Sequence, residues 1–85
     1  MIPRIKTILP LENYILQVSF DSGESVLYDV KEDISTIPSY KDLETINGLF
    51  EQVQIDESRT CVFWTESIDL PSDIIFEYGT PIQPE

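Results

Sequence analysis

The chain has 85 residues and a mass of 9.8 kDa, and its 16 acidic side chains against 5 basic ones give a formal charge of −11 at pH 7. A chain of this length buries roughly 60 to 65% of its unfolded surface, which excludes a second domain and leaves little room for a deep, dry catalytic pocket. Hydrophobic residues make up 41% of the sequence, a fraction typical of a folded protein and not of a disordered one.

The sequence lacks the side chains that several kinds of catalytic, disulfide and metal site need. Histidine is absent and Cys61 is the single cysteine, so the chain has no Ser-His or Cys-His nucleophile, no internal disulfide and no thiolate zinc site. No apolar run approaches the roughly 18 residues of a membrane helix, and residues 1–6 lack the apolar stretch of a secretory signal. We therefore expect a cytoplasmic protein that is not an enzyme, has no cofactor and does not bind membranes.

The acidic charge is unevenly distributed. Residues 1–42 carry 7 acids and 4 bases, whereas residues 43–85 carry 9 acids and a single base, Arg59. The bases are too few and too scattered to neutralise a row of phosphates, which argues against direct nucleic-acid binding. A basic protein partner fits this charge, although solubility alone also explains it.

The first half of the chain predicts three strands. Residues 4–9 form a short strand that Pro10 closes by removing an amide donor. In residues 14–20 apolar side chains alternate with polar ones, the pattern of a half-buried strand. Residues 21–24 contain an aspartate and a glycine suited to a tight turn, and residues 26–30 alternate again. The last two strands should form an antiparallel hairpin.

The period changes to three or four residues in the middle of the chain. Apolar residues at this spacing, with charged residues between them, predict one short amphipathic helix over about 39–47. Ser39 is suited to cap this helix and Gly48 to end it.

A second hairpin follows the predicted helix. Residues 53–55 alternate, residues 56–59 form a turn, and residues 60–64 form a strand that is apolar on both faces. Such a strand takes a central position in a sheet, or meets the helix on one face and a partner subunit on the other.

The last part of the domain is predicted to form a short helical turn. Residues 69–73 place a proline and acids at a helix start, and Gly79 ends the segment. The sequence thus predicts one α+β domain over residues 1–79, with an antiparallel sheet of about five strands in βββ-α-ββ order, one helix packed on it and a short C-terminal helical turn. Residues 80–85 read as a Pro-containing tail.

These segments together resemble a small bacterial family known only as domain of unknown function 2442. The resemblance rests on the following pieces and their order: Tyr14-x-Leu16-x-Val18-x-Phe20, Asp21-x-Gly23-Glu24, Tyr28-Asp29-Val30, Leu43 to Phe50 leading into Val53 and Ile55, and Trp64 before Ile68-Asp69-Leu70-Pro71-x-Asp73. It implies an α+β fold with an antiparallel sheet. It also implies a stand-alone member without the C-terminal helix-turn-helix domain of larger members, encoded beside another small protein in an arrangement like a toxin–antitoxin pair.

Glu66, Asp69 and Asp73 are the densest acidic group near an aromatic residue, Trp64. Hard cations prefer oxygen ligands, and paired carboxylates with unlike environments serve hydrolases, so these three are weak candidates for a metal or catalytic site. The spacing of a calcium loop is missing, and Asp69 is explained more simply as a helix N-cap.

The interface candidates are Trp64 and Val62 on the second hairpin and Arg4 and Lys6 on the first strand. Tryptophan is enriched at binding hot spots, yet it also serves as the main core aromatic of a small domain. Arg4 and Lys6 are suited to protecting a sheet edge from pairing with another chain, and Cys61 reads as a small buried apolar residue.

Three functions follow, in order of preference. The first is a non-enzymatic protein-interaction or accessory domain, antitoxin-like or regulatory, that presents an acidic surface to the product of a neighbouring gene. The second is a homo-oligomeric structural module that associates through residues 60–64 or through an exposed sheet edge. The third is a carboxylate-based metal protein or hydrolase.

Overall fold

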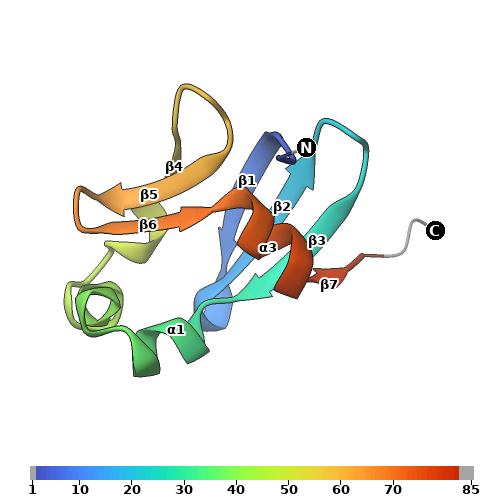
Figure 1. The fold of residues 1–85 in the computed structure, drawn as a ribbon. Helices are drawn as coiled ribbons and strands as arrows, with labels where there is room; N and C mark the ends of the chain where they lie inside the picture. The colour runs from blue at the N-terminus through green and yellow to red at the C-terminus, as the bar shows by residue number, and fades with distance from the viewer. Residues whose placement is uncertain (1, 83–85) are drawn as a thin grey trace.

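The computed structural model describes residues 2–82 and shows a mixed α+β fold (Figure 1). Its strands are β1 (Ile5–Leu11), β2 (Ile15–Phe20), β3 (Ser25–Asp29), β4 (Gln54–Ile55), β5 (Cys61–Thr65), β6 (Ile68–Pro71) and β7 (Thr80–Pro81). Its helices are α1 (Lys31–Thr36), α2 (Asp42–Thr45) and α3 (Ser72–Tyr78), with 3-10 turns η1 (Glu12–Tyr14), η2 (Pro38–Lys41) and η3 (Phe50–Gln52). The predicted class is therefore confirmed, although the order and number of strands differ.

Four antiparallel strands form the first sheet, in the order β1-β2-β3-β7. Leu16, Val18 and Phe20 are buried at alternate positions of β2, as the sequence predicts. The predicted turn follows, with Gly23 at a φ of 94° and the Phe20 N–H donating to the Glu24 carbonyl. This hairpin is the part of the fold that sequence chemistry specifies most directly, because its turn and alternation agree.

The second sheet has three strands in the order β4-β5-β6, so the predicted single sheet is wrong. β5 is central, one of the two positions that its apolar faces suggested. β6 was not predicted as a strand; in it Ile68 and Leu70 are buried while Asp69 and Pro71 are exposed. The predicted C-terminal helical turn that ends at Gly79 is confirmed by α3, but it begins only at Ser72, because Pro71 is the last residue of the edge strand β6.

The single helix predicted over 39–47 is also wrong. The segment that follows β3 is instead divided among α1, η2 and α2. Pro38 is the first residue of η2, where its missing N–H costs nothing, and each short turn buries one side chain, namely Ile34, Tyr40 or Leu43. Ser39 makes no capping hydrogen bond.

Smaller boundary differences concern the strand ends. Pro10 lies inside β1 and does not close it, which an edge strand tolerates. Tyr14 has a φ of 59° and belongs to η1, so β2 begins one residue later. Thr80 and Pro81, which the sequence places in the tail, form β7, whereas residues 83–85 lie outside the described residues.

α3 carries the chain from the three-stranded sheet to the four-stranded one, and it lies in front of the latter in Figure 1. The buried Ser72 Oγ donates to the Pro3 carbonyl at 2.6 Å, and the Phe20 and Phe76 rings meet edge to face at 5.2 Å. Gly79 then passes so close to the sheet that an added Cβ would lie 2.6 Å from the Ile75 carbonyl and 2.8 Å from Val26 Cγ2. α3 is thereby fixed against β3.

Candidate functional site

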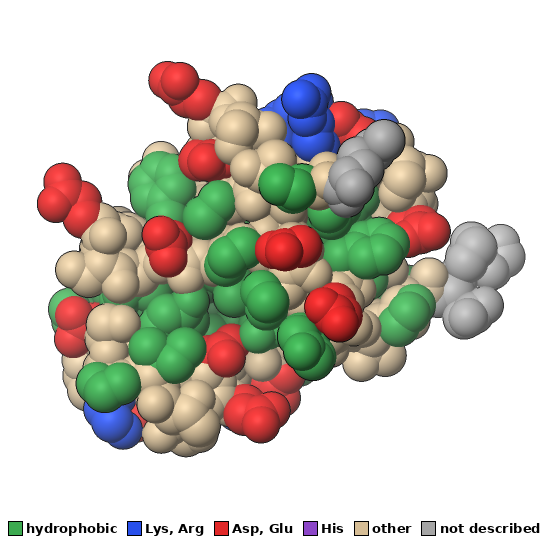
Figure 2. All heavy atoms as spheres, viewed as in Figure 1, with side chains coloured by type: hydrophobic (Ala, Val, Ile, Leu, Met, Phe, Trp, Pro, Cys, Tyr) green, Lys and Arg blue, Asp and Glu red, His purple; other side chains and the backbone are tan. Residues whose placement is uncertain are grey.

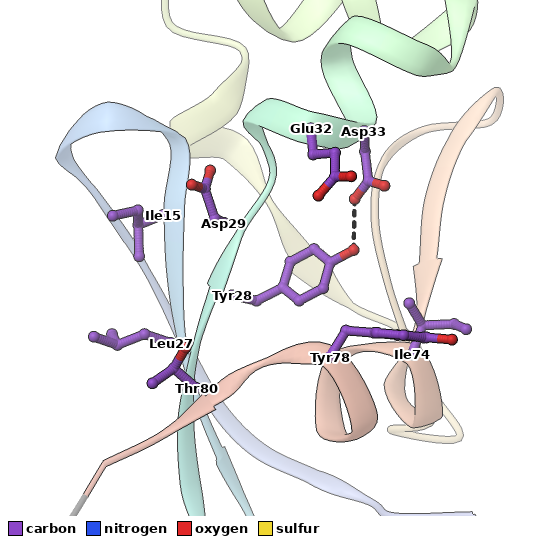
Figure 3. Close-up of a pocket in the computed structure, with 9 residues that line it drawn as sticks. All are labelled: Ile15, Leu27, Tyr28, Asp29, Glu32, Asp33, Ile74, Tyr78 and Thr80. Carbon is purple, nitrogen blue, oxygen red and sulfur yellow. Dashed lines mark hydrogen bonds between the residues drawn. The ribbon is translucent and has the colours of Figure 1, made fainter.

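A groove lies along β3 beyond Thr80, the first residue of β7, and we call it the β3-edge groove (Figure 3). Its volume is about 580 Å³. The residues that line it come from β2, β3, α1, α3 and β7: Ile15, Leu27, Tyr28, Asp29, Glu32, Asp33, Ile74, Tyr78 and Thr80. Apolar, aromatic and acidic side chains thus converge on one hollow, which is the usual composition of a ligand site with an orienting charge.

The hydrogen-bond alternation of β3 explains why the sheet is open here. The Val30 N–H donates to the Tyr14 carbonyl, so the backbone groups of Val26 and Tyr28, in the same phase, also face β2. The intervening residues face the opposite side, where the Ser25 carbonyl accepts from Ile82 and Leu27 lies opposite Thr80. Asp29 is the next residue in this phase. β7 does not extend to it, because the chain before β7 belongs to α3.

Tyr28 is the central side chain of the groove. Its hydroxyl donates to Asp33 Oδ2 at 2.6 Å, and Figure 3 shows the ring pointing from β3 toward the two acidic residues of α1. Burial raises the pKa of Tyr28 above its usual range, and the hydrogen bond and charge of Asp33 and the charge of Glu32 raise it further. The groove therefore has a negative potential that opposes a second anion.

The three carboxylates of the groove are not equivalent. Asp29 Oδ1 accepts the Lys31 N–H at 2.9 Å and pairs with Lys31 Nζ at 3.2 Å, which partly neutralises it. Within the described residues the Asp33 carboxylate accepts only from a neutral hydroxyl, and the exposed Glu32 side chain makes no hydrogen bond or ion pair. Two uncompensated negative charges thus remain on the α1 side of the groove.

Apolar surface borders these carboxylates. Tyr78 is 69% exposed at the end of α3, and Ile74 lies one turn earlier on the same helix. Figure 2 shows hydrophobic side chains in the middle of this face with acidic side chains among them, while the basic side chains lie toward its margins. The surface suits a ligand that combines an apolar stem with a positive charge.

A larger hollow of about 890 Å³ lies around Phe76, with Ile2, Pro3 and Phe20 in its lining. One of its carboxylates, Asp21, is already paired with Arg59 at 2.8 Å. Because no feature of this mainly apolar surface indicates what covers it, the β3-edge groove is the better candidate.

The structure does not assemble the acidic group predicted from Glu66, Asp69 and Asp73. Within residues 2–82 no three histidine, cysteine or acidic residues are placed to hold a metal ion. Glu66 and Asp69 border a shallow depression on the three-stranded sheet, whereas Asp73 lies in α3 and accepts from the Ile74 N–H. The N-cap assignment of Asp69 is wrong as well, because Asp69 lies on β6, where its carbonyl accepts from the Tyr40 hydroxyl.

Two of the interface candidates belong to the core. Val62 is fully buried and Trp64 is 6% exposed, with its Nε1–H donating to the Phe50 carbonyl at 2.9 Å. Their side chains are therefore not available to a partner. Cys61 is only partly buried, and desolvation raises the pKa of its thiol.

Arg4 and Lys6 are exposed, and Lys6 lies on β1, the edge strand of the four-stranded sheet. The edge-protecting role that the sequence suggests for them stays a prediction.

The groove residues were not predicted as a site. Tyr28 and Asp29 read only as the end of a strand, and α1 was not predicted at all, so nothing placed Glu32 and Asp33 beside them. One local signal exists in the sequence: three acids fall within five residues, at positions 29, 32 and 33, directly after a tyrosine. Tyr78 and Thr80 reach the groove only through the crossing of α3 over β3, which is a long-range feature.

The fold and the groove together define a small α+β domain built on two antiparallel sheets, with an acidic and aromatic hollow at an open sheet edge. The chain belongs to the family described as "Protein of unknown function (DUF2442)", whose model matches residues 5–81. No curated protein and no solved structure gives a significant match. Among the described residues, no helix has both the length and the apolar character needed to cross a membrane.

Proposed function

We propose that this domain is a non-enzymatic protein-interaction module whose β3-edge groove binds basic side chains of a protein partner. The observation that carries the proposal is the convergence of Glu32 and Asp33 with the exposed Tyr78 ring in one hollow of about 580 Å³. The net charge of −11 adds a long-range attraction for the same partner.

Lysine and arginine side chains match each part of this lining. Their methylene stems cover apolar surface such as Ile74, and their charged heads reach carboxylates or lie over an aromatic face. An arginine also forms paired hydrogen bonds to a carboxylate, and Glu32 has both of its oxygens free for this among the described residues. A neutral or acidic ligand would gain none of these contacts.

The partner that we propose is a basic protein encoded beside this one, with the domain in an antitoxin-like or accessory role. The family arrangement that the sequence resembles motivates this choice of partner. We place the interaction in the cytoplasm, because the single cysteine requires no oxidising compartment.

Co-purification of the chain with the neighbouring gene product tests the pairing. We expect one complex by size-exclusion chromatography at low salt and a weaker complex at higher salt, because exposed charges are screened. Two separate species under both conditions would contradict it. Light scattering of the chain alone tests the alternative, a homo-oligomer, which a concentration-dependent rise in mass would support.

The groove itself is tested with two matched charge changes. Glu32→Gln removes a groove carboxylate, and Glu57→Gln removes another exposed carboxylate from the turn between β4 and β5. We expect the first variant to weaken binding of the basic partner about tenfold and the second to change it little. Equal effects would show that net charge attracts the partner and that the groove does not bind it.

A further inference from the structure

β7 covers only part of the outer edge of β3. β7 pairs with Val26 and Leu27 only, although β3 continues through Tyr28 to Asp29. The residue that would lie opposite Asp29 in the same register is Tyr78, but Tyr78 belongs to α3. The outward N–H and carbonyl of Asp29 therefore border the β3-edge groove, and no described residue extends the row to them.

The two sides of this uncovered part of β3 carry different side chains, which form two walls of the groove. Figure 3 shows Tyr28, Ile74 and Tyr78 on one side of β3 together with the carboxylates of α1. Ile15, Leu27 and Asp29 lie on its other side in the same view. A chain placed along the edge would present alternate side chains to these two walls, because successive residues of a strand point to opposite faces.

We propose that the basic segment of the partner binds as an extended strand, antiparallel to β3 and in line with β7, with its backbone paired to Asp29. This inference rests on the proposed function and adds the conformation and sequence pattern of the ligand. Addition of a strand to an open sheet edge is a general mode of peptide recognition, in which the backbone bonds give affinity and the alternate side chains give specificity.

The two walls define that sequence pattern. The ligand residue opposite Asp29 shares its face with Ile15 and Leu27, and the carboxylate there is already paired with Lys31, so this position takes an aliphatic side chain. The residue before it points toward the wall that carries Glu32, Asp33 and Tyr78, so it is arginine or lysine. The position after it, opposite Tyr28, is taken by Gly79 in the register of β7, so the ligand leaves the edge there. The ligand is thus an extended segment in which cationic and aliphatic residues alternate.

The length of the open row limits the affinity. Only Tyr28 and Asp29 extend beyond β7, so the backbone contributes a single pair of hydrogen bonds and the side chains contribute the rest. Interfaces of this small extent are typical of weak and transient complexes.

The test uses the whole chain and three synthetic peptides in which arginine and valine alternate. One peptide is unmodified, one is N-methylated at every valine, and one is N-methylated at every arginine. The three have the same charge and side chains, but in the proposed register only the valine N–H groups face Asp29. We expect methylation of valine to weaken binding at least about tenfold relative to methylation of arginine, since it removes a bond to the edge and introduces a clash.

Amide hydrogen exchange supplies the second measurement. Binding of the unmodified peptide should slow exchange of the Asp29 amide about tenfold or more, while the outward amide of Ile8 on β1 remains unchanged. Equal binding of the two methylated peptides, with binding still sensitive to Glu32→Gln, would overturn strand addition and leave the proposed function standing. No binding of the unmodified peptide at millimolar concentration would overturn both.

Discussion

The two edges of the four-stranded sheet differ in how they meet solvent. At the β1 edge, Pro10 places an imide nitrogen where an outward N–H would otherwise stand, and the Ile5 N–H is bonded to the Arg59 carbonyl at 2.7 Å. At the β3 edge, β7 covers two residues and leaves Asp29 beside an acidic groove. One edge is closed to another chain by proline and local bonding, and the other remains open over a surface with defined chemistry.

The largest expected effect comes from the close approach that fixes β7. Gly79→Ala adds a Cβ that would lie 2.8 Å from Val26 Cγ2 on β3 and 2.6 Å from the Ile75 carbonyl of α3, so the end of α3 must shift relative to β3. The φ of Gly79 is −71°, which alanine adopts freely, so the cost arises from packing alone. We expect the free energy of unfolding to fall by about 1 to 3 kcal/mol, measured by urea denaturation.

Thr80→Ala is the matched control for this substitution, because Thr80 is exposed on β7 next to Gly79. It should change stability by less than about 0.5 kcal/mol. An unchanged urea midpoint for Gly79→Ala would mean that α3 does not lie tightly on β3, and the groove would then lose one of its walls.

Alkaline pH should destabilise the β3 edge through its tyrosine. The pKa of Tyr28 is raised above its usual range and that of Tyr40 is raised to about 12, mainly by burial. Above pH 10 the unfolded chain loses these protons while the folded chain retains them, so stability falls as pH rises and is unaffected by them below pH 10. Each tyrosine contributes a slope of up to about 1.4 kcal/mol per pH unit.

Urea denaturation between pH 9 and 12 measures this slope, and Tyr28→Phe should reduce it by the share of one tyrosine. The comparison requires a Cys61→Ala background, because the pKa of this thiol is also raised and its titration would overlap. If Tyr28→Phe had the same slope as the parent, the Tyr28 hydroxyl would not be buried beside Asp33 in the groove.

The sequence predicted the parts of the fold in which local signals agree with one another. The β2–β3 hairpin has alternation, a turn aspartate and a glycine at positive φ, all of which specify the same structure. The helix over 39–47 was wrong because the period of three to four residues was maintained across η2 and α2, two short turns that each bury one side chain. A periodic pattern does not distinguish one helix from consecutive turns when tertiary contacts anchor each turn separately.

The β3-edge groove could not be predicted from the sequence, for a different reason. Tyr28 and Asp29 meet Tyr78 and Thr80 only because α3 crosses β3, and the chain separation between them is about 50 residues. Local rules also suggested a helix start at Asp69, whereas Asp69 pairs with Phe63 in a sheet that itself was not predicted. Residues that are brought together by strand order leave no spacing signal in the sequence.

A smaller effect is expected from the ion pair that joins the β2–β3 turn to the turn before β5. Arg59 and Asp21 are separated by 2.8 Å with side chains 42% and 43% exposed. A double-mutant cycle of Arg59→Gln and Asp21→Asn should give a coupling of about 0.2 to 1 kcal/mol that decreases with salt. A coupling that persists in high salt would mean that the pair closes the β1 edge more firmly than its exposure suggests.

The smallest effect on stability, and the most direct test of the closed edge, is expected from Pro10→Thr. Pro10 lies opposite Leu16, whose backbone bonds to β3, so the new N–H would point outward from the sheet. Stability should change by less than about 0.5 kcal/mol, but light scattering should detect concentration-dependent association that the parent lacks. Lys6→Thr in the same strand keeps Pro10 and removes a basic charge, so it tests whether Lys6, and not Pro10, prevents association. If both variants stayed monomeric, Pro10 would not be what closes the β1 edge. The two edges of the sheet would then differ only in the groove beside β3.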